Sequence, residues 1–306
     1  MSTALYEPKI ARSSGDRVFD AIIFVLLTGV FLLVAYPLYF IIISSVSSPS
    51  AVAAGEVVWL PVGFNLAGYK AVFEEQAVMR GFVNALVYTA VGTSINLVVT
   101  IPTAYALSRD DFFGRKAVNL FYVVTMFIGG GLIPTYIVVR SCGFIDSIWA
   151  LTIPGAISVF NMIVARTFFK TTIPQELLEA AKLDGCGNSR FFFHIALPLS
   201  GAIIAIMVLY YGIGHWNAYF SALLYMNTPE KFPLQLVLRT ILVQNSMQLA
   251  QVTNDPNALK ALEEKRLIAE LMKYSLIIIS SIPVMILYPF VQKHFVKGVM
   301  IGSIKG

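Results

Sequence analysis

The sequence predicts an all-α membrane protein with six transmembrane helices and with both ends in the cytoplasm. Of its 306 residues, 57% are hydrophobic and only 13% are charged, whereas a soluble domain has roughly 45–50% apolar and about 25% charged residues. The mean hydropathy is +0.75. Because a soluble fold cannot bury this much apolar surface, lipid must solvate much of the chain. This composition excludes a disordered protein and an ordinary cytosolic enzyme.

Six windows without Asp, Glu, Lys or Arg predict the six spans. A spanning helix needs about 20 apolar residues, and a charge at mid-bilayer costs roughly 2.5–3.5 kcal/mol. The windows cover residues 21–55, 81–108, 117–139, 147–165, 191–229 and 274–292. The first window could also be a cleavable secretory signal. Its apolar run of about 25 residues exceeds the 7–15 of a signal core, so we expect an uncleaved span.

The basic residues set the predicted orientation. The short connection 109–116 carries Arg109, Arg115 and Lys116, and short basic connections stay in the cytoplasm. The expected order is a cytoplasmic segment 1–17, a first transmembrane helix 18–46, an outer loop 47–80, a transmembrane domain 81–292 with spans two to six, and a cytoplasmic tail 293–306. Within the domain we expect an inner loop at 171–196 and a polar, partly helical outer loop at 227–273.

Several classes of protein fit poorly. The two cysteines, Cys142 and Cys186, are too few for a disulfide scaffold or a multi-cysteine metal cluster, and we expect no metal site. No H-E-x-x-H pattern suggests a membrane-embedded metalloenzyme. The six windows contain no Asp or Glu, which argues against a proton-coupled secondary transporter. A standalone channel remains physically possible.

The inner loop carries the most specific pattern. Residues 171–200 read TTIPQELLEAAKLDGCGNSRFFFHIALPLS, which predicts two short helices joined by a turn. Pro174 suits the start of the first helix and Gly185 its end. That helix of about 11 residues, or ~16 Å, is too short to span and must lie on the cytoplasmic surface. It could dock a partner, or it could pack on its own bundle or at the lipid interface.

Polar residues inside the spans are candidates for the transport path, because their burial in lipid is costly. Asn96 is polar and lies within the second window. The path candidates that we single out are Asn161, His215, Asn217, Tyr136 and Tyr219. The simpler explanation is a hydrogen bond between helices, typically worth about 0.6 kcal/mol. The glycine triplet 129–131 either interrupts the third span or permits close helix approach.

The inner loop resembles the EAA loop of type I ABC importer permeases. Glu179-Ala180-Ala181 is followed after three residues by Gly185, and then after nine by Ile195-x-Leu197-Pro198. The likeness covers roughly residue 82 to the C-terminus. It is greatest for the smaller permease of maltose-type carbohydrate importers, in the subgroup that handles oligosaccharides. The run 129–134, the Trp216-Asn217 pair and the tail 295–306 agree with it.

The resemblance implies a type I ABC importer permease fold in a bacterial cell (inner) membrane. The loop would be a coupling helix that docks in a groove of an ATPase, with Glu179 pairing with a basic residue there. Its further docking residues would be Ala180, Ala181, Asp184 and Gly185. In the tail, Ser303 to Gly306 would reach the ATPase dimer interface.

The implied partners are a second permease subunit in a heterodimer, an ABC ATPase dimer, an extracytoplasmic solute-binding protein and a sugar substrate. The chain has no G-x-x-x-x-G-K-[ST] phosphate loop, so we expect no cofactor in this chain and ATP with Mg bound by the partner ATPase. The net charge of +5 reflects cytoplasmic loops, and we expect no nucleic-acid partner. An importer of another solute, such as an amino acid or a phosphonate, remains the alternative.

Overall fold

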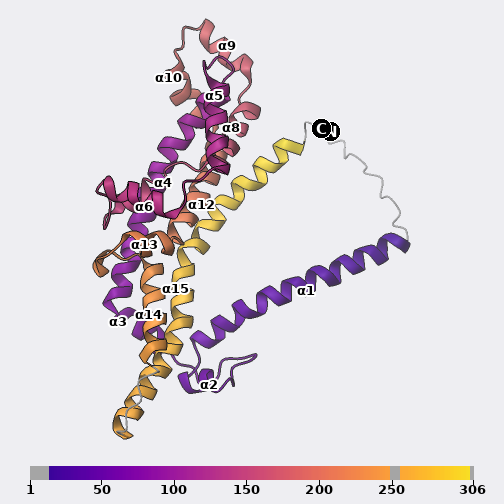
Figure 1. Ribbon diagram of the computed structural model, residues 1–306. Helices are drawn as coiled ribbons and strands as arrows, with labels where there is room; N and C mark the ends of the chain where they lie inside the picture. Colours follow the sequence, from indigo (N-terminus) through magenta and orange to yellow (C-terminus); the bar gives the residue numbers. More distant parts are fainter. Residues whose placement is uncertain (1–13, 249–255, 304–306) are drawn as a thin grey trace. The chain divides into compact units, whose positions relative to one another are not determined.

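The computed structural model describes residues 14–248 and 256–303, in which all regular secondary structure is helical. The long helices are α1 (Ser14–Ser45), α4 (Gln76–Ser108) and α15 (Pro256–Ser303) (Figure 1). The shorter helices are α2 (Pro49–Ala53), α3 (Ala67–Glu74), α5 (Arg115–Phe127), α6 (Leu132–Ser141), α7 (Ile148–Thr152), α8 (Val159–Thr172), α9 (Gln175–Leu183), α10 (Asn188–Phe191), α11 (Leu197–Leu199), α12 (Gly201–Trp216), α13 (Tyr219–Tyr225) and α14 (Leu234–Gln248). A π-helical turn η1 (Phe192–Ala196) and a 3₁₀ turn η2 (Pro229–Lys231) complete the set.

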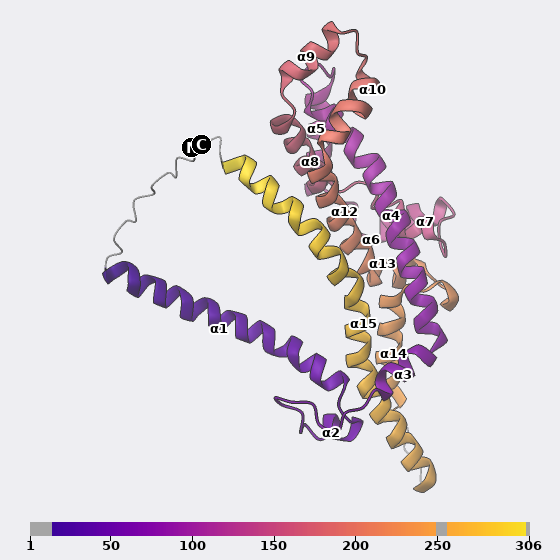
Figure 2. The ribbon, with the colours of Figure 1, turned by 180° about the vertical axis from the view of Figure 1, so that it is seen from behind.

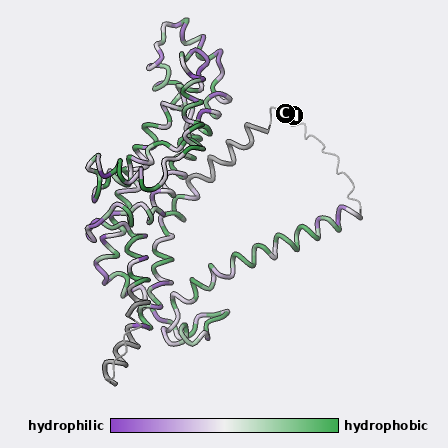
Figure 3. Tube along the Cα trace, in the orientation of Figure 1, coloured by the Kyte–Doolittle hydropathy of each residue, from purple (hydrophilic) through white to green (hydrophobic). Residues whose placement is uncertain are grey.

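The chain divides into two compact units. The first comprises residues 1–69 and 260–278, and the second residues 70–259 and 279–306. In the first unit, none of the most apolar 18-residue window of α1 is buried, and Figure 3 shows α1 as hydrophobic along most of its length. A helix that is apolar all round and exposed is matched to lipid or to another apolar protein surface.

The core of the second unit lies between α4, α8 and α12. α4 packs against both other helices, and Ala104, Met162 and Met207 are fully buried at their contacts. Figures 1 and 2 show α4 running from the end of the unit that carries α14 to the end that carries α9 and α10. Near α9, the ring of Tyr105 packs at 4.9 Å from that of Phe192. α4 is therefore the central support of this unit.

The predicted spans are helical, but several are interrupted. Within the part of the chain that the structure describes, three helices are long and apolar enough to cross a bilayer by themselves, namely residues 15–45, 76–108 and 266–289. Two more candidates are bent pairs: α5 with α6, at 116°, and the segment 188–199 with α12, at 77°. The break between α5 and α6 falls on the glycine triplet, as one of the two interpretations predicted.

The fourth window does not form one straight helix. α7 ends at Thr152, and α8 begins only at Val159. Pro154 has no N–H to continue the helical hydrogen bonds, and Gly155 disfavours a helix, so the sequence itself explains this interruption. α8 then extends beyond the window to Thr172.

The predicted polar outer loop contains an apolar helix. α14 packs against α4, and its Leu234, Leu236 and Val237 are buried. A Cβ atom at Gly81 of α4 would lie 2.9 Å from the Val237 side chain, so a glycine is needed at this close approach. α14 is thus a packed element of the bundle, while residues 249–255 lie outside the described residues and residues 256–273 belong to α15.

Gly131 should be essential to the bend between α5 and α6. It has φ 83° and ψ 175°, a region open almost only to glycine. We expect Gly131→Ala to cost about 1–3 kcal/mol, measured as the free energy of unfolding of the purified protein. The matched control is Gly129→Ala, because a Cβ there would meet nothing within 4 Å and its φ is not in the strained range. Equal stability of the two variants would contradict this account of the bend.

Candidate functional site

The surface helix predicted at 171–196 is α9. Pro174 stays extended at its N-cap with ψ 142°, so the helix begins at Gln175 and has nine residues rather than about eleven. Glu176 lies in its first turn, where the helix dipole favours an anion. Gly185 follows the end of the helix with φ +73°, which a glycine adopts without strain.

The two faces of α9 differ in what they contact. Leu177, Leu178 and Ala181 pack toward the core of the second unit, and Ala181 is only 8% exposed. Glu179 and Ala180 are exposed on the other side. The two small residues that were expected to dock a partner therefore face different ways. Ala180 faces outward, whereas Ala181 packs the helix against its own bundle.

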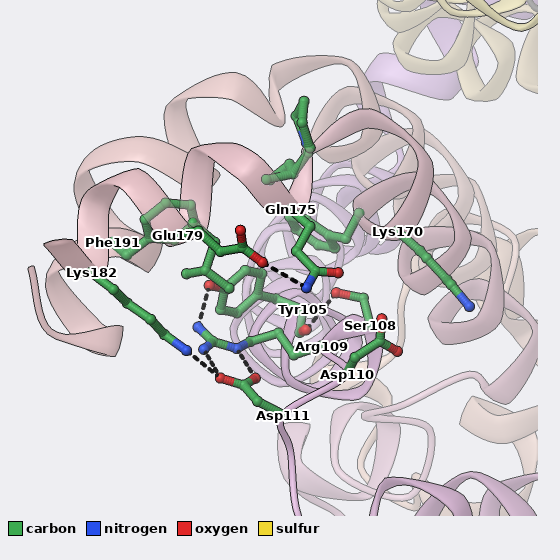
Figure 4. A pocket seen from close by; sticks show the side chains of 14 residues that line it. Tyr105, Ser108, Arg109, Asp110, Asp111, Lys170, Gln175, Glu179, Lys182 and Phe191 are labelled. Carbon is green, nitrogen blue, oxygen red and sulfur yellow. Dashed lines mark hydrogen bonds and ion pairs between the residues drawn. The ribbon is translucent and has the colours of Figure 1, made fainter.

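An ion-pair bridge fastens α9 to the end of α4. Lys182 Nζ donates to Asp111 Oδ2 at 2.8 Å, and Arg109 Nε donates to Asp111 Oδ1 at 2.8 Å (Figure 4). Arg109 Nη1 also donates to the Tyr105 hydroxyl at 3.0 Å, and the Arg109 side chain is only 8% exposed. Hydrogen bonds from Arg109 and then Lys182 hold the pKa of the Asp111 carboxyl well below its usual range. We call Lys182, Asp111 and Arg109 the cytoplasmic bridge, after the side of the membrane on which the sequence predicts this loop.

A cavity of about 320 Å³ opens beside this bridge, between α9 and the end of α4. Figure 4 shows Glu179 and Gln175 on its α9 side, and Gln175 Nε2 donates to Glu179 Oε1 at 3.0 Å. Because a carboxylate has about four acceptor positions, Glu179 keeps acceptor capacity for an outside donor. The sequence pattern does not predict the bonds of Asp111 and Arg109, because cations in a short connection indicate only its orientation.

The candidates for the transport path do not form one visible site. His215 Nε2 lies 2.6 Å from Asn96 Oδ1, and Asn161 is buried near the start of α8. Asn217 is exposed after α12, and Tyr219 is 46% exposed.

The last path candidate, Tyr136, and the tail residues Ser303 and Gly306 expected to contact the ATPase lie elsewhere in the chain. Tyr136 stacks on Tyr225 with ring centroids 6.0 Å apart. In the tail, Ser303 is the last residue of α15, and Gly306 lies outside the described residues.

At the other end of α4, the turn 227–232 is held in place by polar contacts. Asp146 Oδ1 accepts from the backbone N–H groups of Asn227 and Thr228, each at 3.0 Å, and Lys231 Nζ donates to Asp146 Oδ2 at 2.7 Å. From α4, Tyr88 Oη donates to the Lys231 carbonyl at 2.9 Å, and Asn84 contacts two more carbonyls of the turn. We call 227–232 the clamped turn.

Asp146 has a backbone φ of 59°, the left-handed region. This region is uncommon for a residue other than glycine, although Asp tolerates it better than most. Hydrogen bonds from Lys231, and then from Thr228, hold the pKa of the Asp146 carboxyl well below its usual range. The hydrogen bonds of Asp146 therefore offset the free-energy cost of its left-handed backbone conformation.

Removing the lysine from the cytoplasmic bridge should loosen α9. We expect Lys182→Met to raise hydrogen exchange of the backbone amides of 175–183 by about fivefold, because an ion pair of this exposure is worth up to about 1 kcal/mol. Lys170→Met is the matched control, since Lys170 lines the same cavity but is not part of the bridge. Unchanged exchange in Lys182→Met would show that the bridge does not hold the helix.

The Asp146 clamp should depend on pH in a defined way. Because its pKa is depressed in the folded state, its stabilisation is complete above the ordinary carboxyl pKa of about 3.9 and is lost as the pH falls below that value. We expect Asp146→Asn to lower the thermal denaturation midpoint by a constant amount between about pH 8 and 5, and by less below about pH 4. Glu56→Gln, at an exposed carboxylate, is the control. If the difference in denaturation midpoint between the wild type and Asp146→Asn did not change with pH, the Asp146 carboxylate would not stabilise the fold in this way.

Comparisons with known proteins extend the likeness to nearly the whole chain. No protein-family model matches it. It is 36% identical over 291 residues, covering 95% of this chain and 99% of the relative, to the polygalacturonan/rhamnogalacturonan transport system permease protein YtcP of Bacillus subtilis (strain 168). It is 25% identical over 292 residues, covering 92% of this chain and 95% of the relative, to the maltodextrin transport system permease protein MdxG of the same organism.

A solved structure is also similar. A chain from a bacterial ABC transporter involved in the import of the acidic polysaccharide alginate has a TM-score of 0.84 and 31% identity. The match covers 94% of this chain and 100% of that chain.

Proposed function

This chain belongs to the family of permease subunits of carbohydrate ABC importers, and on that premise we propose that it forms half of a heterodimeric pore for an oligosaccharide. It is a transport subunit of the bacterial cell membrane and not an enzyme. Membership implies an ATPase and a solute-binding protein as partners. The second half of the pore would be a different permease chain. ATP and Mg would be bound by the ATPase.

The exposed face of α9 is the observation that carries the proposal. Leu183 is 90% exposed at the end of the helix, beside the exposed Glu179 and Ala180. A small residue between a carboxylate and a leucine allows close approach of another protein, one charge pair and one apolar contact. We assign this face to the ATPase, with Glu179 pairing with a basic residue. Asp184 and Gly185 would shape its end, and the tail Ser303–Gly306 would reach the ATPase dimer interface.

Closure of two ATPase subunits on ATP would move α9. The cytoplasmic bridge would carry that motion to α4, because Asp111 binds both Lys182 of α9 and Arg109 at the end of α4. We propose six membrane crossings with cytoplasmic ends, of which the interrupted α7–α8 segment is the fourth. Rigid motion of these crossings would alternate access between the two sides of the membrane.

The clamped turn would face the solute-binding protein. Asn84 contacts this turn, and Arg109 belongs to the cytoplasmic bridge. Asn84 and Ser108, the last residue of α4 and the neighbour of Arg109, are about 36 Å apart at 1.5 Å per residue, more than the ~30 Å of the hydrocarbon core. The turn and α9 therefore belong on opposite sides of the membrane. The exposed residues of the turn, Asn227, Pro229, Glu230 and Lys231, would form the outer contact.

The substrate we propose is an oligosaccharide, since the transporters named for the relatives and for the solved structure handle maltodextrin, polygalacturonan/rhamnogalacturonan and alginate. Amide, imidazole and aromatic groups suit sugar hydroxyls and ring faces. The path candidates are Asn161, His215, Asn217, Tyr136 and Tyr219. Uptake competition by amino acids or phosphonates, with none by oligosaccharides, would favour the alternative substrate class.

The double variant Glu179→Ala with Gly185→Pro should uncouple the transporter. The first change removes the carboxylate from the docking face. The second places proline, whose φ is near −65°, where Gly185 has φ +73° and its N–H donates to Lys182 O at 3.0 Å. We expect loss of ATPase assembly, or at least a tenfold fall in uptake per ATP hydrolysed.

The matched control for this experiment is Glu176→Gln, which changes an exposed carboxylate of the same helix. It should assemble and transport normally. The measurements are co-purification of the ATPase and sugar uptake by the complete transporter in vesicles. Full assembly and transport in the double variant would disprove the assignment of α9 as the coupling helix.

A further inference from the structure

The interruption of the fourth crossing leaves backbone polar groups without helical partners. Residues 153–158 lie between α7 and α8, at a point where the chain packs against the middle of α4. Inside a bilayer no water is available for such groups, so other parts of the protein must bind them. An unsupported break of this kind would also act as a hinge, because the helical hydrogen bonds that stiffen a span stop there.

The side chain of Asn96 binds two backbone carbonyls in this break. It lies on α4 and is fully buried. Its Nδ2 donates to the Gly155 carbonyl and to the Ala156 carbonyl, each at 2.8 Å. An amide nitrogen has two N–H groups, so both are used. The Asn96 side chain therefore joins α4 to two backbone carbonyls of the segment 153–158, those of Gly155 and Ala156.

The same amide fixes the orientation of His215 on α12. Because both N–H groups of Asn96 face carbonyls, its Oδ1 faces the ring and accepts from His215 Nε2 at 2.6 Å. The proton of the neutral ring must then be on Nε2, and Nδ1 is left for other partners. Gly92 makes room for this ring, since a Cβ there would lie 2.5 Å from Nε2. Asn96 thus connects three elements of the bundle.

A second connection lies one helical turn further along α4. Thr100 Oγ1 is 2.8 Å from Tyr211 Oη of α12. The same Tyr211 oxygen accepts from the Ser158 backbone N–H at 3.1 Å, directly before α8. The break is therefore held at its carbonyls by Asn96 and at the start of α8 by Tyr211. We call these contacts the mid-span clamp.

We propose that Asn96 is a positioning residue that makes α4, α8 and α12 move as one body. This inference rests on the proposed function. α8 leads directly into the coupling helix, because only residues 173 and 174 separate it from α9. Movement of α9 would bend the chain at 153–158 if the break were free. With the mid-span clamp in place, the movement passes to α12 and to the orientation of His215.

The test uses the complete reconstituted transporter with Asn96→Ala. We expect uptake per ATP hydrolysed to fall about tenfold, while ATPase assembly stays intact and ATP hydrolysis changes by less than about twofold. The control is Ser94→Ala on the same helix, whose hydroxyl is exposed and donates only within α4, to the Ala90 carbonyl at 2.8 Å. It should keep the wild-type ratio.

A second variant, Tyr211→Phe, keeps the ring and removes only the hydroxyl of the clamp. We expect about a threefold fall in uptake per ATP hydrolysed. Because this variant changes less of the protein, it tests the mid-span clamp even if Asn96→Ala does not assemble with the ATPase. The proposal would be overturned if the assembled variants kept the wild-type ratio of uptake to ATP hydrolysis, including the case in which uptake and hydrolysis fall in proportion. Failure of the wild-type chain to bind an ATPase would instead refute the proposed function.

Discussion

The bilayer imposes one constraint on which the rest of this structure depends: every backbone polar group in the hydrocarbon must find its partner within the protein. Long helices meet it by themselves, as α4 does. The interrupted crossings cannot, so each break requires an arrangement of its own. At 153–158 the partners are the Asn96 amide and the Tyr211 hydroxyl. Polar side chains in the spans thus mark interruptions of the helices.

α4 connects the parts that transport requires. One end meets α9 through Asp111, its middle holds the break at 153–158 through Asn96, and its N-terminal part holds the clamped turn through Asn84 and Tyr88. Each contact is a short hydrogen bond from a side chain to a fixed partner. Under the proposed function, a single helix with these contacts would give a physical route from the ATPase side to the outer side.

The exposed surfaces have a common explanation. α1 and the α5–α6 bend present large apolar side chains to the outside, with Phe24 70% and Phe127 79% exposed. In water such surfaces would favour aggregation, whereas lipid, and in the proposed heterodimer a second permease subunit, would cover them. Charged groups of the second unit gather instead near α9, where Figure 3 shows hydrophilic segments of the trace, and again near the clamped turn, where Lys231 pairs with Asp146. This division of surface agrees with a permease subunit that has a membrane part between two polar ends.

The sequence by itself determined the helical membrane class, the family and the location of α9, because composition, charge-free windows and the spacing from Glu179 to Pro198 are local properties. It also contained the break at 129–131, where Gly131 adopts a backbone conformation open almost only to glycine. Pro154 and Gly155 account for the break at 153–158, although the charge-free window predicted an uninterrupted fourth span. The sequence did not reveal the packing of α14 or the bonds of Asp111, Asp146 and Asn96. Apart from the Arg109–Asp111 pair, these bonds join residues between 59 and 119 positions apart in the chain, and the packing of α14 depends on which helix faces are buried. Only the tertiary structure decides them, since a hydrogen bond requires atoms within about 3 Å, and spacing along the sequence does not specify that distance.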